Sequence, residues 1–406
     1  MKELGTASSI QTGKPGYWDL VAGGDPFRLL FPLGAILGIL GVSLWPWYVF
    51  GQGAWYPGQT HARIMVQGFL AAFATGFLGT ALPRALQVPR LVLGEILTVA
   101  AGLSLVVGLQ LSRQMLYGDM VFLVVMIFFL SRVILRLPAR VGNPPPGFVL
   151  VGMGMLCALA GTSILVLAQS GLLDVPGWVA RLGLLFLYQG FLLLPVMGIG
   201  AFLLPRFFQN AEERDFPMSR KLPPGWGAGA ILALTCGAAI LASFFLEARG
   251  ETRWGATLRM VAIVAYFVRE VPFFQKSWGR CTLGWGMRVA LTSVPLGYLL
   301  IALWPGWALS FLHVVYISGF SLLVFFVASR VVLGHCGRER MIFAPLRWLL
   351  IVSVLLAIAL FTRVSTDWMP ALRMRHYAYA AITWATGAFL WFAYVVPLLR
   401  HPEEEG

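Results

Sequence analysis

Residues 308–333 read ALSFLHVVYISGFSLLVFFVASRVVL, and they carry a clear structural signal. Apart from His313, the only ionisable group of note in this stretch is Arg330. An α-helix needs about 20 predominantly apolar residues to cross the hydrocarbon core of a bilayer. Residues 308–333 are therefore predicted to form a transmembrane helix.

Apolar stretches of the same kind recur along the whole chain, separated by breaks that carry Pro, Gly or Arg. We expect an all-α, polytopic membrane bundle of about twelve transmembrane helices, because runs near 20 residues do not fit the alternating strands of about 10 residues in membrane barrels. The eighth segment is the weakest, since Arg269 and Glu270 lie near its end. The segments lie at roughly 27–50, 61–82, 91–112, 119–136, 147–170, 178–204, 226–246, 256–274, 283–303, 308–333, 345–363 and 371–398.

Composition excludes several other classes of protein. Of the 406 residues, 59% are hydrophobic and 12% are charged, about half the charged share of a soluble domain. The mean hydropathy is +0.80. A soluble enzyme, a disordered chain and a disulfide scaffold are excluded, and the four cysteines form no CxxC motif. The net charge of +13 comes from single basic residues in short loops, so a lipid bilayer and no nucleic acid is the expected partner.

The basic residues also predict an orientation. With the N-terminus in the cytoplasm, 21 of the 30 Lys and Arg residues fall on the cytoplasmic side, which satisfies the positive-inside rule. We therefore expect both termini to be cytoplasmic, in a bacterial inner membrane. The predicted parts are a cytoplasmic N-terminal segment at 1–25, a membrane domain at 26–400 and a cytoplasmic tail at 401–406.

Three of the five histidines fall at one depth in this topology. His61, His313 and His376 each lie near the outer end of a predicted span, whereas His335 lies at the opposite end and His401 in the tail. Ionisable residues in a membrane are costly and usually have a partner or a function. Neutral imidazole is a common metal and haem ligand, so two of the three could share a metal. Alternatively, each histidine forms local hydrogen bonds near the headgroups.

Small residues continue the helix face below His61. Met65, Gly68, Ala72 and Gly76 follow it at helical spacing, so a flat macrocycle could lie against this face. The alternative is close packing of a neighbouring helix, for which the same small-residue spacing is typical. The pattern leaves both interpretations open.

Several short motifs resemble the NnrS family of bacterial membrane proteins. They are Asp25-Pro26-Phe27-Arg28, His61-Ala62-Arg63-Ile64-Met65 with Gly68-Phe69, Gly76 to Pro83, Leu204 to Phe208, His313, and Ser329 to Arg338. The resemblance implies haem and copper binding and a role in nitric oxide metabolism and denitrification. The family's second His and its Glu in the first motif are Arg63 and Ile64 here, which weakens the prediction of copper.

The pattern of spans is also similar, more distantly, to subunit I of the haem-copper oxidases. That resemblance implies haem b held by His61 and His313, with His376 as an alternative ligand. Residues 178–204 and 226–246 contain no histidine, so no binuclear oxygen-reducing centre is expected. Arg363, Arg373 and Arg375 could pair with haem propionates, as could Arg63. Alternatively, the three arginines between 363 and 375 contact lipid headgroups.

The function these observations favour is haem-mediated binding or electron transfer in nitric oxide metabolism, with a respiratory electron donor. A role as an enzyme stays open. One alternative is a transporter, which the proline-broken span at 178–204 would suit. Glu95 is then the only clear intramembrane acid that could couple ions. The other alternative is a structural or assembly subunit of a respiratory complex.

Overall fold

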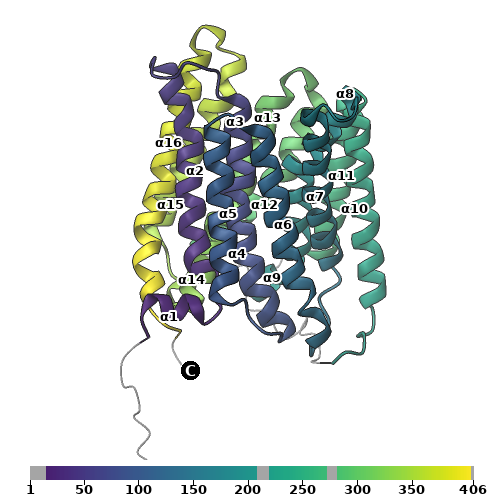
Figure 1. Cartoon of the computed structure of the whole chain (residues 1–406), viewed down its shortest axis with the longest axis vertical. Helices are drawn as coiled ribbons and strands as arrows, with labels where there is room; N and C mark the ends of the chain where they lie inside the picture. Colours follow the sequence, from purple (N-terminus) through teal and green to yellow (C-terminus); the bar gives the residue numbers. More distant parts are fainter. Residues whose placement is uncertain (1–14, 208–218, 272–280, 404–406) are drawn as a thin grey trace, which may run out of the picture.

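A computed structural model describes residues 15–207, 219–271 and 281–403, with 201–207 described as helix backbone only. All the secondary structure in these residues is helical, and the long helices run side by side (Figure 1). Eleven of the helices in this part of the chain are long and apolar enough to cross a membrane. The predicted fold class, a polytopic helical bundle, is confirmed.

The spans fall into three successive units of four. The first unit comprises α2 (Phe27–Val49), a second span, α5 (Leu93–Leu111) and α6 (Met115–Ile134). Its second span runs from α3 (Gly58–Arg63) through a π-helical segment, η1 (Ile64–Leu70), into α4 (Ala71–Leu86). The second unit has α7 (Phe148–Ser170), then α8 (Gly177–Leu185), η3 (Phe186–Gly190) and α9 (Phe191–Phe207), then α10 (Trp226–Ala248) and α11 (Thr252–Glu270). The third has α12 (Thr282–Leu303), then α13 (Ala308–His313), η6 (Val314–Ser321) and α14 (Leu322–His335), then α15 (Arg347–Val364) and α16 (Arg373–Val395).

The weak eighth segment forms α11, which lies between its neighbours α10 and α12. It is not among the eleven helices that are apolar enough to span by composition alone. Arg253, Arg259, Arg269 and Glu270 lower its hydropathy. The bundle therefore has twelve long helical positions in its described part, one of them unusually polar.

The three units pack in the same way and close into a ring. The first span of each unit packs against the π-helical segment of the second: α2 on η1, α7 on η3 and α12 on η6. The fourth span of each unit packs against the first span of the next, and α16 returns to α2. Each π-helical segment contains a polar residue followed by Gly, namely Gln67-Gly68, Gln189-Gly190 and Ser318-Gly319. The bundle thus has a pseudo-threefold arrangement.

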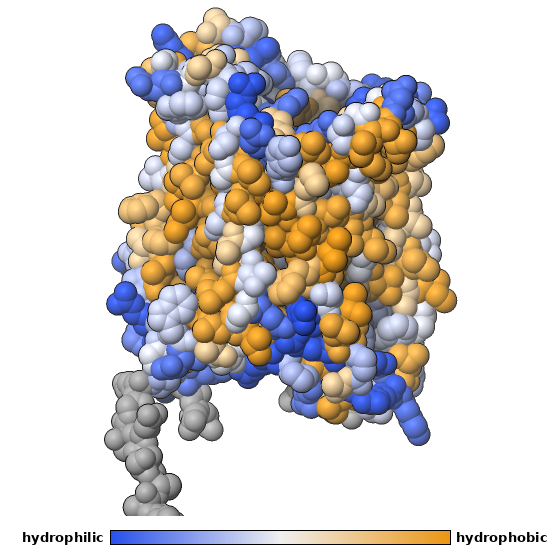
Figure 2. All heavy atoms as spheres, viewed as in Figure 1, coloured by the Kyte–Doolittle hydropathy of each residue, from blue (hydrophilic) through white to orange (hydrophobic). Residues whose placement is uncertain are grey.

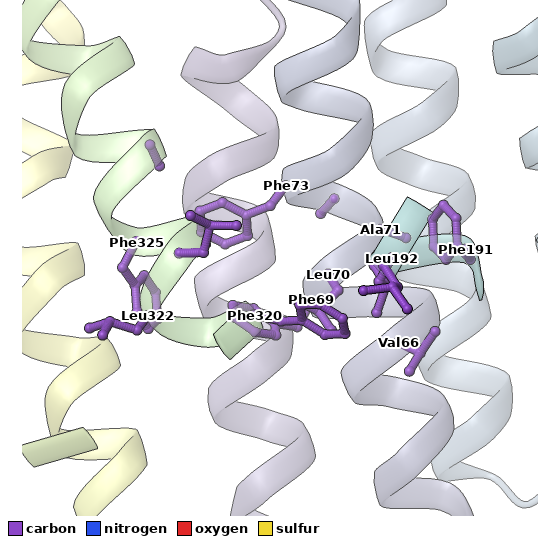
Figure 3. Packing of buried hydrophobic residues seen from close by; sticks show 14 of the residues in the cluster. Val66, Phe69, Leu70, Ala71, Phe73, Phe191, Leu192, Phe320, Leu322 and Phe325 are labelled. Carbon is purple, nitrogen blue, oxygen red and sulfur yellow. The ribbon is translucent and has the colours of Figure 1, made fainter. Parts of the chain in front are cut away.

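The second spans of the units form the centre of the bundle. Their most apolar windows are 78%, 67% and 61% buried, the largest share within each unit. Phe69 and Phe73 of the first unit pack against Phe325 of the third, as the close-up shows (Figure 3). Apolar side chains also form the visible belt around the outside of the bundle, with polar residues at both ends (Figure 2). This distribution fits a lipid bilayer around the belt.

The first and the last described residues lie at one end of the bundle, here called the terminal end, opposite α3 and α13 (Figure 1). Arg28 joins the two termini there. Its guanidinium is 1% exposed and donates to the backbone carbonyls of His335 at 2.9 Å, Leu399 at 2.7 Å and His401 at 2.9 Å. It also forms an ion pair with Asp25 at 3.1 Å. The start and the end of the membrane domain are thereby held together.

Candidate functional site

Two histidines lie at the opposite end, here called the histidine end, each just before a π-helical segment. His61 is in α3 and its Nδ1 lies 3.0 Å from the carbonyl of Gly41. His313 ends α13 and its Nδ1 lies 2.7 Å from the carbonyl of Leu309. A carbonyl only accepts, so each Nδ1 carries the proton in these bonds. Each Nε2 is left with its lone pair, and neither Nε2 has a hydrogen-bond partner among the described residues.

The two imidazoles lie in one region of the histidine end. The guanidinium of Arg363 is near both rings, and the rings are near each other. Trp45 of α2 packs edge-on against His61 with ring centroids 5.8 Å apart. The same indole lies 4.7 Å from the ring of Tyr377 in α16. Residues of the first and third units therefore meet at this end.

Arg363 lies at the end of α15 and is 9% exposed. Its Nη1 donates to Ser310 Oγ at 3.2 Å and to Thr366 Oγ1 at 3.0 Å, and its guanidinium lies 4.5 Å from the ring centroid of Tyr377. Its charge also interacts with Asp367. Within the described ranges, however, no carboxylate lies within ion-pair distance of it. A buried cation held by hydroxyl groups and an aromatic face is a suitable partner for an external anion.

Three further polar atoms at this end are buried without a hydrogen bond. They are Thr60 Oγ1, next to His61 in the chain, Gln110 Oε1 and Arg373 Nε. The guanidinium of Arg373 lies near that of Arg363 and near the Tyr56 hydroxyl. Arg375, by contrast, is exposed. Buried polar atoms are nearly always satisfied, so unpaired ones in a cluster indicate a place where a polar ligand group can bind.

Arg63 has a carboxylate partner within the bundle. It forms an ion pair with Asp119 of α6 at 3.0 Å, and the Asp119 side chain is fully buried. Gln67 and Gln169 each donate to the same carboxylate at 2.7 Å, and Arg63 also donates to Tyr188 Oη at 3.4 Å. The sequence suggested that Arg63 could pair with a haem propionate. In the structure, its guanidinium instead pairs with Asp119.

The second unit contains a matching cluster around Arg259, which is 1% exposed. Its guanidinium pairs with Glu247 at 2.8 Å and donates to Gln189 Oε1 at 2.7 Å and to Ser243 Oγ at 3.0 Å. Tyr298 donates to the same Gln189 oxygen at 2.9 Å. Each unit thus holds one buried arginine near the histidine end.

Comparison of the three clusters singles out the third. Arg63 and Arg259 are each neutralised by a carboxylate of the bundle, whereas Arg363 has hydroxyl groups and Tyr377 instead. The third cluster is also the one beside His61 and His313. The site therefore combines two imidazoles with a buried cation whose anion does not come from the described residues.

Sequence reasoning missed Asp119 and Glu247, and the expectation that Glu95 is the only intramembrane acid is wrong. Asp119 is 0% exposed. Glu95 instead lies in the first turn of α5 and pairs with Arg136 at 2.6 Å. The two missed acids stand at the edges of the predicted spans 119–136 and 226–246.

The small-residue face below His61 packs against other helices. A Cβ at Gly68 would meet Val107 of α5 at 2.7 Å, and one at Gly76 would meet Leu30 of α2 at 3.0 Å. Met65 is half-buried and lies next to Gly41. Helix packing, the alternative that the sequence left open, accounts for this face.

The remaining histidines have other partners. His376 Nδ1 lies 2.9 Å from Ser365 Oγ, on the same side of the bundle as Arg363. His335 contacts Arg84 and lies 2.7 Å from Glu403 at the terminal end. No group of three or more His, Cys, Asp or Glu side chains in the described ranges could hold a metal ion. A pair of axial imidazoles needs no such group, and copper stays a prediction.

These features define a multi-pass helical membrane protein with two histidines at one end, one from its first and one from its third four-helix unit. The profile of the NnrS protein family matches residues 24–403, and the chain belongs to this family. That membership makes it a membrane protein related to nitric oxide. No curated protein matches the chain.

Proposed function

We propose that the protein binds haem b at the histidine end and acts in nitric oxide metabolism by haem-mediated binding or electron transfer. In this proposal the chain lies in a bacterial inner membrane with the haem near its outer face. One observation carries it: His61 and His313 present unbonded Nε2 atoms beside Arg363, the buried arginine without a carboxylate.

The residues present fit the needs of a haem. His61 and His313 would be the axial ligands, because imidazole nitrogen binds haem iron and both Nε2 atoms are available. Arg363 would bind a propionate, and Arg373 would supply a second cation. Bound haem would supply a one-electron redox centre.

The backbone carbonyls have a defined role in this site. The carbonyls of Gly41 and Leu309 accept the Nδ1 protons of His61 and His313, which fixes the tautomer that has a metal-binding Nε2. Such hydrogen bonds also orient the ring and raise the basicity of the ligating nitrogen. Trp45 limits the rotation of His61 from one side.

The test is a pyridine-haemochrome spectrum with metal analysis on the purified protein. His61→Ala and His313→Ala should each lose haem or convert it to the high-spin form. His335→Ala is the matched control, since His335 lies at the other end of the bundle, and its spectrum should be unchanged. Loss of the Soret band in His376→Ala with no change in His313→Ala would assign the second ligand to His376.

A carbon monoxide difference spectrum of the dithionite-reduced protein tests the coordination state. Two axial histidines leave no open position on the iron, so a small and slow spectral change is expected. A full and rapid change would show an open position and would favour gas binding over electron transfer. Reduction of oxygen is not expected in either case.

Ion-coupled transport has less support. Asp119 is fully buried and Glu247 half-buried, as acids that couple ions can be, but each is paired with an arginine, and Asp119 accepts further hydrogen bonds from Gln67 and Gln169. The purified protein should therefore be coloured by haem, which a transporter or a colourless assembly subunit would not be.

A further inference from the structure

An apolar cavity of about 100 Å³ lies deeper in the bundle, among the second spans of the three units. None of the residues that line it has a polar side chain. They come mainly from η1, α4, α9 and α14, with Phe31 of α2 and Leu291 of α12 completing the wall. Figure 3 shows Leu70, on the second span of the first unit, close to Leu192, on the second span of the second unit.

The lining excludes water as the preferred occupant. An ordered buried water needs two to four polar partners, and this wall offers side chains of Leu, Phe, Ala, Val, Ile and Pro. Apolar cavities of roughly 150 Å³ stay dry and bind small apolar molecules such as benzene or xenon. The cavity is therefore suited to an uncharged ligand without hydrogen-bonding groups.

The size of the cavity limits the ligand further. Pockets for drug-sized molecules measure roughly 300–1,000 Å³, well above the volume found here. Ala74, Phe77 and Val196 are only half-buried, so parts of the wall keep accessible surface. A molecule of a few atoms fits these limits.

We propose that this cavity is a binding site for small apolar molecules of the class of dissolved diatomic gases. Such molecules partition into the bilayer that surrounds the bundle and need no polar contact once inside. Leu70 and Phe73 stand on the same span as His61, and Leu323 on the same span as His313. A gas molecule in this cavity would therefore contact the two spans that carry His61 and His313.

Xenon is the probe, because it is apolar, of similar size and detectable by anomalous scattering or by ¹²⁹Xe NMR. The purified full-length protein should show one saturable xenon site at the cavity. Ala74→Phe fills the cavity and should abolish that site. The matched control is Ala101→Phe, which adds the same ring on an exposed position of α5 and should leave xenon binding unchanged.

A second variant keeps the test valid if Ala74→Phe does not fold. Leu70→Ala enlarges the cavity and should raise xenon occupancy. Equal xenon binding in Ala74→Phe and the parent protein would overturn the proposal, as would an ordered water or a lipid chain in the cavity. Xenon binding should persist in His61→Ala, which is expected to lose haem. The cavity proposal and the haem proposal are therefore tested independently.

Discussion

Two of the buried arginines near the histidine end, Arg63 and Arg259, are each balanced by a carboxylate of the bundle. Asp119 accepts from the side chains of Arg63 and Gln67 on one span and of Gln169 on another. A buried ion pair adds little net stability over apolar packing, but an unpartnered buried charge is strongly destabilising. The pair therefore acts mainly as a constraint on how α3, α6 and α7 fit together.

Replacement of Asp119 tests this constraint. Asp119→Ala leaves the Arg63 guanidinium buried without its anion, and we expect a loss of about 3–5 kcal/mol in stability. The measurement is the thermal unfolding midpoint of the detergent-purified protein. The double variant Arg63→Met with Asp119→Leu removes both charges and should recover most of the loss. A double variant no more stable than Asp119→Ala would show that the helices need the charges themselves.

Cys336 allows a test at the terminal end. Burial raises the pKa of the Cys336 thiol to about 11, and the side chain receives a hydrogen bond from Arg28 at 3.5 Å. At pH 8 only about one thiol in a thousand would be the reactive thiolate. A variant that keeps Cys336 as its only cysteine should resist a maleimide in the folded state and react in denaturant.

The control for this labelling is an exposed cysteine in the same background. Ser112→Cys places a thiol on an exposed position between α5 and α6, where rapid labelling is expected. Arg28→Ala should increase labelling of Cys336 because it removes the contacts that close this end. Labelling of Cys336 as fast as that of the S112C thiol would contradict its burial.

The sequence predicted that His61 and His313 lie at the same end of their spans, but it did not predict the buried polar residues around that end. His61 and His313 could be placed because apolar runs fix the ends of the spans. Asp119 and Glu247 could not, because an acid at the edge of an apolar run resembles a loop residue until its partner on another helix is known. The arginine that neutralises each acid comes from another helix, and helix pairing is invisible to hydropathy.

At the scale of elements, the π-helical segments are the least predictable feature. Ile64–Leu70, Phe186–Gly190 and Val314–Ser321 occur in apolar runs whose composition is that of an ordinary helix. π-Helical turns are rare and often occur at functional sites. Here two of the three directly follow the candidate ligands, and the segments carry Gln67 and Gln189 into the buried clusters.

Glycines on α7 provide a matched test of helix packing. A Cβ at Gly154 would lie 2.3 Å from Cδ of Pro195 in α9, whose ring cannot move aside. Gly154→Ala should therefore destabilise the protein by about 1–3 kcal/mol. A Cβ at Gly152 meets nothing within 4 Å, so Gly152→Ala should be neutral or stabilising by up to about 1 kcal/mol.

The two alanine variants are compared by unfolding midpoint in the same detergent. The two substituted positions lie two residues apart on the same helix, so the gain in helix propensity from Gly to Ala is the same in both variants. A Gly154→Ala protein as stable as Gly152→Ala would mean that α7 and α9 are farther apart than described.

At the scale of the whole molecule, closure of the ring depends on both chain ends. Arg28 donates to the carbonyls of Leu399 and His401, which follow the last long helix. A chain that stops at Val395 loses both acceptors and leaves the buried guanidinium undersatisfied. Two hydrogen bonds to a charged group are worth roughly 3–6 kcal/mol together, so the melting temperature should fall clearly.

The control truncation stops at Glu403 and keeps every acceptor of Arg28. Its melting temperature and its elution as a single species should match those of the full chain. Equal stability of the two truncations would show that Arg28 finds other partners and that the C-terminal segment does not close the ring.

The threefold repeat of the whole molecule could not be predicted from sequence similarity either. The similarity of Gln67-Gly68-Phe69 to Gln189-Gly190-Phe191 extends over only a few residues, and the third unit has Ser318 in place of the glutamine. Packing relations reveal the repeat, because each unit makes the same contacts with the next. Eleven of the long helices were predictable from hydropathy, whereas the grouping of the helices into units depends on which helices touch.

Four spans per unit have a consequence for how such a chain can arise. An even number of long helices returns the chain to the end of the bundle at which it started, so all three units run in the same direction. Tandem duplication of an ancestral gene for four helices could thus yield this architecture without any segment changing its direction. Two of the units hold an internal acid beside their arginine, and the third holds Arg363 with hydroxyl groups, at the end where the two imidazoles lie.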